Sequence, residues 1–467
     1  MAQAKGILPR REDREVLWKS PRACGYFIAV KLDPTIDRPR VEALLGKISA
    51  LVDALVARAE SGEKIAAVAV GLAPSFFIAN GQPRFADLEP PAAFTKPLPS
   101  VSAPPIDADL MLYVVSTYEA RVNAFISDLH AIRPDVQAII FDRGFQRMDG
   151  TEPFGYADGL RNVRTDDRPR VVFVHRDGLQ GEEPHWADGG SCMAFMRIRQ
   201  RPEQFAALAD DATRDAVIGR KKDGTRLDLE GQKNVKPRDE LAEPAPALPP
   251  GAHVAKAGPR GPRDDNQIFR RGLPFMETTP DGQLRVGLNF CSFQGSLEQF
   301  DVVFNDWMMN LHFPTDGPVD ALLDPAKQLT QIEKVGFYFV PPYEPAGLAT
   351  AVFKEAQKHK PTTGRLVIKK RVIADGDPSH RFDRRGFVFQ IFDENQQAVG
   401  EPFTTDTAGR GVCPVELEIG KSYTARETAS TVVQSVTLKD TPFTMNKPNV
   451  ELAVENVVPS SSPYGGG

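Results

Sequence analysis

The chain has 467 residues, of which 41% are hydrophobic and 25% charged, so it can bury more than one sizeable core. Its net charge of -5 comes from mixed signs spread along the sequence, which excludes a dominant basic surface and makes nucleic acid an unexpected partner. The four cysteines lie far apart without a CxxC pair, which disfavours a zinc site or a disulfide framework.

The beginning of the chain carries no unbroken apolar stretch of the kind a secretory signal needs. Residues 1–19 read as a charged leader, and no later segment offers the roughly 20 apolar residues required to cross a bilayer. We therefore expect a cytoplasmic protein with no membrane span, and we leave a surface location or non-classical export open.

Two stretches of the sequence repeat one pattern of strands and helices. Residues 20–165 read as the strand GYFIAVKL, the helix VEALLGKISALVDALVARA, the strands IAAVAVGL and DLMLYVVS, and the helix EARVNAFISDLHAI. Residues 166–357 begin a second round with RVVFVH, followed by the strand CMAFMRIRQ, the helix RPEQFAALADDATRDAVIGR, the strand LRVGLNFCSF, the helix SLEQFDVVFNDWMMNL and the strand GFYFVPP. This split alternation predicts an α+β fold with two ferredoxin-like domains, rather than a doubly wound sheet.

The pattern changes after residue 357. Residues 364–458 read as short strands between turns such as DGD and ENQQ, which predicts a small all-β sandwich as a separate domain. The remaining residues, 459–467, are Ser, Pro and Gly with little to bury, so a disordered tail is expected.

Two segments carry the residue types of a reactive site. In EPFGYADGLRN, Gly155 and Gly159 frame Asp158, so a carboxylate can be held at close quarters, although Asp before Gly is also ordinary turn chemistry. In GAHVAKAGPRGPRDDNQIFRRGLPF, His253 precedes a dense set of arginines that includes Arg270 and Arg271. A neutral imidazole can ligate iron and guanidiniums can neutralise haem propionates, but a solvated basic loop with an incidental histidine has the same composition.

These segments, in this order, resemble the dye-decolorising (DyP-type) haem peroxidase family. The similar stretches are GYADG at residues 155–159, GGSCMAFMRIRQRPEQF, DAVIGRKKDGTRL, HVAKAGPR, IFRRGLPF, GLNFCSFQGSLEQF and GFYFVPP, which together span roughly residues 20 to 345. The resemblance implies two ferredoxin-like domains of the dimeric α+β barrel type, with haem b held mainly by the second.

The resemblance also implies roles for particular residues. His253 is then the axial iron ligand, and Asp158 and Arg270 are the catalytic groups on the opposite face, with Arg271 as the alternative distal arginine. The further cofactor-binding residues implied are Arg270, Arg271, Gly155 and Phe290. Asp324 and Glu333 are the candidates for the acid that orients the imidazole.

The activity implied is reduction of hydrogen peroxide with one-electron oxidation of dyes, phenols or other aromatic donors. A haem-binding protein that releases iron, resembling a deferrochelatase, is the alternative within haem biology. An adhesion or scaffold protein with degenerate peroxidase domains is the alternative of another class. The oligomeric state and a protein partner for the C-terminal sandwich are left open.

The C-terminal region resembles the Cna protein B-type domains of bacterial surface proteins. The similar stretches are FQIFDENQQAVGEPFTTDTAGRG, KSYTARETAS and ELAVEN. Some such domains form an internal amide bond between a Lys and an Asn beside a buried acid. The resemblance implies Lys369 or Lys370, Asn456 and Glu427 as candidates, while three exposed polar residues on an ordinary sandwich are equally compatible with the sequence.

Overall fold

The computed structural model describes residues 24–60, 66–85, 88–132, 135–147, 149–175, 183–229, 248–258, 265–342, 344, 346–353, 363–375, 377–381, 384–406, 408–430, 437–446 and 449–458. The predicted leader and tail lie outside these residues. Within the described ranges, no helix is long and apolar enough to span a membrane.

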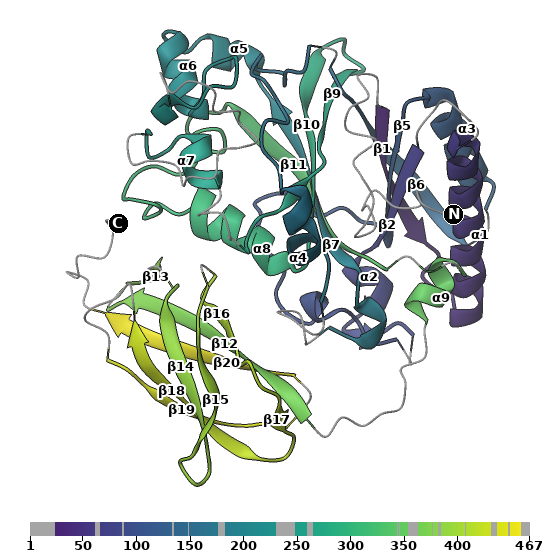
Figure 1. Ribbon diagram of the computed structural model, residues 1–467. Coiled ribbons are helices and arrows are strands. Elements are labelled where there is room, and N and C mark those ends of the chain that lie inside the picture. The colour runs from purple at the N-terminus through teal and green to yellow at the C-terminus, as the bar shows by residue number, and fades with distance from the viewer. Residues whose placement is uncertain are drawn as a thin grey trace.

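The N-terminal half forms four main strands in ferredoxin-like order. Its elements are β1 (Cys24–Leu32), α1 (Arg38–Glu60), β2 (Ala66–Leu72), α2 (Pro74–Phe77), β3 (Ile78–Ala79), β4 (Gln82–Pro83), η2 (Ala92–Phe94), β5 (Leu110–Ser116), α3 (Glu119–His130) and β6 (Val136–Phe145). The sheet order β6-β1-β5-β2 is antiparallel, and α1 and α3 lie together on one side of it (Figure 1). The side chains of β1 alternate between the two faces of the sheet. Tyr26 and Ile28 lie in the core under these helices, and Phe27 lies in the core on the other face.

The second half repeats this order. Its elements are η3 (Thr165–Asp167), α4 (Arg168–Val172), η4 (His185–Ala187), β7 (Ser191–Gln200), α5 (Pro202–Ala206), α6 (Asp211–Ile218), η5 (Leu227–Leu229), α7 (His253–Ala257), β8 (Phe269–Arg270), β9 (Leu273–Thr278), β10 (Leu284–Gln294), α8 (Leu297–Asp301), the π-helix η7 (Val302–Met308), β11 (Thr330–Val340) and α9 (Leu348–Val352). The order β11-β7-β10-β8, with β9 also on β10, confirms the predicted α+β class with two ferredoxin-like halves. The repeat begins at β7 and not at RVVFVH, because residues 170–172 belong to helix α4, whose second residue is Pro169.

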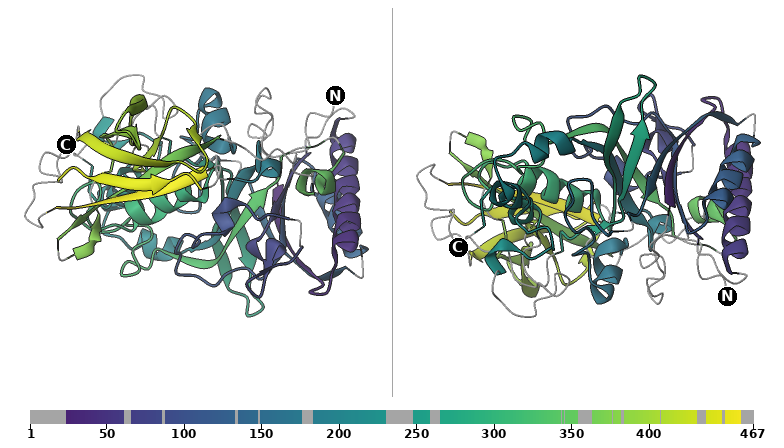
Figure 2. Two further views of the ribbon diagram at one scale, coloured as in Figure 1. Left: turned by 90° about the horizontal axis from the view of Figure 1, so that it is seen from below. Right: turned by 90° about the horizontal axis from the view of Figure 1, so that it is seen from above.

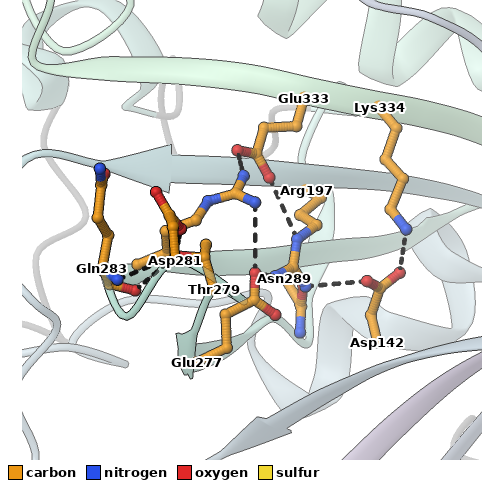
Figure 3. A network of polar contacts seen from close by, with 10 residues as sticks. Asp142, Arg197, Glu277, Thr279, Asp281, Gln283, Asn289, Glu333 and Lys334 are labelled. Atoms are coloured by element: carbon orange, nitrogen blue, oxygen red, sulfur yellow. Dashed lines mark hydrogen bonds and ion pairs between the residues drawn. The ribbon is translucent and has the colours of Figure 1, made fainter.

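The two halves share one sheet of nine strands. Strand β11 joins β2 at the single pair Phe339 and Leu72. The opposite edge closes through a polar network in which Arg197 binds Asp142 of β6, Glu277 of β9 and Glu333 of β11 at 2.9, 2.7 and 3.2 Å (Figure 3). The Arg197 guanidinium also lies 3.7 Å over the ring of Phe275. A buried cation with three carboxylate partners therefore fastens β6 to the second half.

The C-terminal region is a two-sheet sandwich below the second half in Figure 1. Its strands are β12 (Thr363–Ala374), β13 (Asp377–Arg381), β14 (Phe387–Asp393), β15 (Ala398–Thr404), β16 (Arg410–Val412), β17 (Leu417–Glu418), β18 (Ser422–Ser430), β19 (Asp440–Thr444) and β20 (Asn449–Val458). One sheet is built on β12, which pairs with β20 in parallel, and the other has the order β15-β14-β18-β19. The inner faces meet in a core of their own, which includes Ile368, Phe389 and Ala425.

The sandwich contacts the second half through charged side chains. Glu298 of α8 binds Arg410 and lies 3.4 Å from Lys369 of β12. Burial by itself would raise the pKa of Glu298, but Arg410 and Lys369 outweigh it and hold that pKa below its ordinary value. Arg384 binds Asp306 of η7 in the same surface.

Asp406 closes a turn beside this contact and makes the stability of the sandwich depend on pH. Its carboxylate accepts hydrogen bonds from the backbone N–H groups of Ala408 and Arg410, yet burial raises its pKa to about 6. A folded pKa above the ordinary 3.8 favours the protonated form, so stability falls as pH rises from about 4 to 6. We expect Asp406→Asn to raise the free energy of unfolding at pH 7.5 by on the order of 2 kcal/mol and to change it little at about pH 3.5, below the ordinary pKa of the carboxyl.

The measurement is denaturant unfolding at both pH values. Asp393→Asn is the matched control, because Asp393 accepts the same two kinds of backbone hydrogen bond, from Asn395 and Gln397, in an exposed turn. An equal loss of stability at both pH values in Asp406→Asn would contradict the prediction.

Candidate active site

His253 is the first residue of α7, and a buried acid holds its ring. The imidazole Nδ1 lies 2.8 Å from Oδ2 of Asp320, which is fully buried. An ionised carboxylate only accepts hydrogen bonds, so Nδ1 carries the proton and Nε2 keeps its lone pair. Within the part of the chain that the structure describes, Nε2 makes no hydrogen bond, and the His253 side chain is 39% exposed. This arrangement fits an imidazole prepared to ligate a metal.

The residue that orients His253 differs from both candidates suggested by the sequence. Asp324 accepts a hydrogen bond from the N–H of Ala326 and caps a turn. Glu333 belongs to the network around Arg197. The sequence left this acid unassigned, and neither Asp324 nor Glu333 is the partner of the ring. Asp320 is the residue that sequence spacing missed, because its contact with His253 bridges segments far apart in the chain.

The backbone of Asp320 is fixed on both sides. Its N–H donates to the carbonyl of Met308 at the end of η7, and its Oδ1 accepts from the N–H of Leu322. The next residue, Ala321, donates to Gly251, two residues before the histidine. The carboxylate and the imidazole are thus held by the backbone as well as by each other.

The side chain of Lys256, one turn after His253, fixes the position of α7. Its side chain is fully buried, and its ammonium donates to the carbonyls of Asn310, at 2.6 Å, and Phe313. The buried charge is therefore compensated by carbonyl oxygens, and α7 is fixed against the loop that follows η7.

Asp158 lies in the glycine loop as the sequence predicts. Gly155 and Gly159 have φ values of +86° and +68°, which only glycine adopts readily. The Asp158 N–H donates to Gly150, and its Oδ1 accepts from the N–H of Gly159. The Asp158 residue is exposed to solvent, whereas these hydrogen bonds fix the backbone of the loop.

Arg270 is tied to the same loop through Asn162. The Asn162 amide donates to the carbonyl of Arg270 and accepts from its N–H, and the Arg270 guanidinium donates to the carbonyl of Arg161. Burial and the charge of Arg220 lower the pKa of Arg270, and the negative charge of Asp158 opposes that shift. The Arg270 residue is exposed to solvent.

Arg271 points to the opposite face of the sheet. Its side chain is buried, with the guanidinium 4.4 Å over the ring of Phe269, and its carbonyl accepts a hydrogen bond from Tyr113. Phe269 and Tyr113 belong to the core on the other face of the sheet. Of the two adjacent arginines, only Arg270 is therefore grouped with Asp158.

Phe290 of β10 lies on the same face of the sheet as Arg270 of β8. Arg270 is the strand partner of Ser292, and residues two apart on a strand share a face. Phe290 is partly buried against Phe300 of α8, with ring centroids 6.4 Å apart. The predicted pocket residue thus packs against α8 on the face of the sheet that carries Arg270.

The turn at residues 219–222 contacts both helix α7, which begins with His253, and the loop that contains Asp158. Gly219 has a φ of +87°, which favours glycine, and a Cβ there would lie in tight contact, 3.1 Å, with Val254, the neighbour of His253. Lys222, in the same turn, accepts a hydrogen bond from the N–H of Ala157. The segment after α6 therefore holds α7 and the Asp158 loop in a fixed relation.

Comparison with known proteins agrees with this geometry. The family model described as Dyp-type peroxidase, C-terminal, matches residues 151–345, which include His253, Asp320, Asp158, Arg270 and Phe290. Over these residues the chain is similar to the DyP-type peroxidases. The DyP-type resemblance predicted from the sequence is therefore confirmed over residues 151–345, and the Cna-B resemblance stays a prediction.

Individual DyP-type relatives match more remotely. A dye-decolorizing peroxidase from Mycetinis scorodonius is 24% identical, and the match covers 45% of this chain and 51% of that protein. A deferrochelatase from Yersinia pseudotuberculosis is 27% identical, and the match covers 44% of this chain and 49% of that protein. The chain thus spans about half the length of the curated relatives it matches. The crystal structure of a DyP-type peroxidase from Streptomyces coelicolor superposes with a TM-score of 0.59 at 22% identity, covering 76% of this chain and 97% of that one, which shows the shared fold.

Proposed function

We propose that this protein is a haem-dependent peroxidase that reduces hydrogen peroxide and oxidises aromatic donors in one-electron steps. The observation that carries the proposal is the His253 imidazole, whose Nδ1 is held by buried Asp320 and whose Nε2 is left to bind a metal. A structural relative from Streptomyces lividans, 22% identical, is described in ferric and oxyferrous forms, which supports iron as the metal. The cytoplasmic location and the boundaries of the domains remain predictions.

The residues present fit haem b. His253 would hold the iron through Nε2, with Asp320 increasing the basicity of the ring. Arg270 would supply a cation to the pocket, and Phe290 and the open loop at Gly155 would form walls of it. Haem, when bound, supplies the iron that exchanges electrons with peroxide and with the reductant.

Asp158 and Arg270 supply the acid–base and electrostatic parts of the reaction. Cleaving the peroxide O–O bond requires a proton to leave one oxygen and reach the other, so that the departing oxygen leaves as water. The Asp158 carboxylate can accept and return that proton. The Arg270 guanidinium, which remains charged, can stabilise the negative charge that develops on oxygen.

The proposed distal pair is tested by three variants. We expect Asp158→Asn and Arg270→Leu each to lower kcat/KM for peroxide by about 10²- to 10⁴-fold, because each removes one of these interactions. Arg271→Lys keeps a cation over Phe269 and is expected to retain most activity. Stopped-flow kinetics with peroxide and a dye gives the values, and full activity in both distal variants would overturn the assignment of these roles.

The match to a deferrochelatase supports a second candidate, release of iron from haem. Sustained peroxide-dependent oxidation of a dye favours the peroxidase, whereas haem binding without turnover, accompanied by free iron, favours the second candidate. A purified protein without haem, after expression with ample iron and porphyrin precursor, would instead favour the adhesion or scaffold interpretation.

A further inference from the structure

Two buried polar side chains on β10 have hydrogen-bonding groups without a partner. Ser292 and Gln294 are both fully buried. Within the described residues, the Ser292 hydroxyl and both amide atoms of Gln294 make no hydrogen bond. Leaving such a group unpaired costs about 1–3 kcal/mol, so native proteins satisfy it with water or a ligand.

The strand register places these groups beside Arg270. Ser292 is the direct antiparallel partner of Arg270, and cross-strand partners project from the same face with Cβ atoms about 4.5–5.5 Å apart. Gln294 follows two residues later and so shares this face. The neighbours on the opposite face, Cys291 and Phe293, are apolar core residues. The unpaired polar groups therefore lie on the face that carries the distal arginine.

The surroundings explain why no group of the described residues satisfies them. The strand partner of Gln294 on β7 is Cys192, and that of Ser292 is Ala194, both buried members of the apolar core that also contains Phe300 and Phe304. A hydroxyl in such surroundings requires a small polar molecule as its partner. Because Arg270 is the strand partner of Ser292, a small molecule that bound Ser292 would lie on the face of the sheet that carries this arginine.

We propose that Ser292 is a third distal binding residue, whose hydroxyl hydrogen-bonds the small oxygen ligand on which Asp158 and Arg270 act, with Gln294 holding a water molecule behind it. The inference rests on the proposed haem function and adds to it a neutral hydrogen-bonding group that does not transfer the proton. Ser292 would fix the orientation of peroxide, while Arg270 supplies charge.

Fluoride binding to the ferric holoprotein tests this role without turnover. Fluoride is a strong hydrogen-bond acceptor, so its dissociation constant reports the donors around the distal ligand. We expect Ser292→Ala to weaken fluoride binding by about two- to tenfold, the value of one neutral hydrogen bond, with haem content unchanged. Ser292→Thr retains the hydroxyl and is expected to bind fluoride more tightly than Ser292→Ala.

Cys291→Ala is the matched control. It removes one buried atom from the adjacent position of β10 on the other face, so it reproduces any general loosening of the strand and is expected to leave fluoride affinity unchanged. A dissociation constant for Ser292→Ala equal to that of the wild type, while Arg270→Leu weakens binding, would overturn this inference alone. A wild-type chain that takes up no haem would overturn the proposed function and this inference together.

Discussion

His253→Ala is expected to abolish tight haem binding. The substitution removes the only side-chain atom proposed to ligate the iron, and the Asp320 carboxylate remains buried with one partner fewer. The absorption spectrum of the purified protein should lose its Soret band or show it weakened and shifted, and added imidazole should partly restore it. Asp320→Ala should keep the ligand but lower haem affinity by about 10- to 100-fold, because the ring loses its fixed orientation.

His312 offers a control with the same local chemistry. Its Nδ1 also lies 2.8 Å from an aspartate, Asp316, but that carboxylate is 85% exposed. His312→Ala should therefore leave the haem spectrum unchanged. A full Soret band of wild-type shape in His253→Ala would show that another residue ligates the iron, and it would remove the basis of the proposed function.

The second large effect is expected in the sandwich, at Lys370. The structure favours Lys370 over Lys369, since the Lys370 ammonium is fully buried 2.9 Å from Oε1 of Glu427, while Lys369 lies in the contact with Glu298. Glu427 also accepts a hydrogen bond from the Asn456 amide, at 3.0 Å. Burial lowers the pKa of Lys370, which favours the free amine.

This geometry supports an amide bond between Lys370 and Asn456. The Lys370 nitrogen would attack the Asn456 side-chain carbonyl, Glu427 would transfer the proton, and ammonia would leave. We expect the intact mass of the protein to be lower than the sequence mass by one ammonia. The cross-link closes a long loop, so its loss is expected to cost the sandwich roughly 4 kcal/mol.

Neighbouring variants make this prediction specific. Lys370→Met and Glu427→Gln should both show the full sequence mass, whereas Lys369→Met should retain the loss of ammonia. Mass spectrometry of the intact proteins, followed by thermal unfolding, gives both quantities. The full sequence mass in freshly purified wild-type protein would contradict the bond and leave Lys370 and Glu427 as a buried ion pair.

The periodicity of the sequence was sufficient to predict most of the elements and the fold class. Strands such as β1 and β7 alternate or are continuously apolar, and α1 and α3 show helical spacing, because local burial imposes these patterns on the chain. The glycines around Asp158 also carried local information, since positive φ values at Gly155 and Gly159 require glycine. Motif order was enough to recognise the family of residues 151–345.

The choice among chemically equivalent residues required the tertiary structure. Asp320, Asp324 and Glu333 are all acids downstream of His253, and only the packing of α7 against the segment after η7 brings Asp320 to the ring. Arg270 and Arg271 are adjacent and identical in type, but the pairing of β8 with β10 sends them to opposite faces. Such choices depend on contacts between distant segments, which local periodicity does not record, whereas the strands and helices themselves depend on neighbours in the chain.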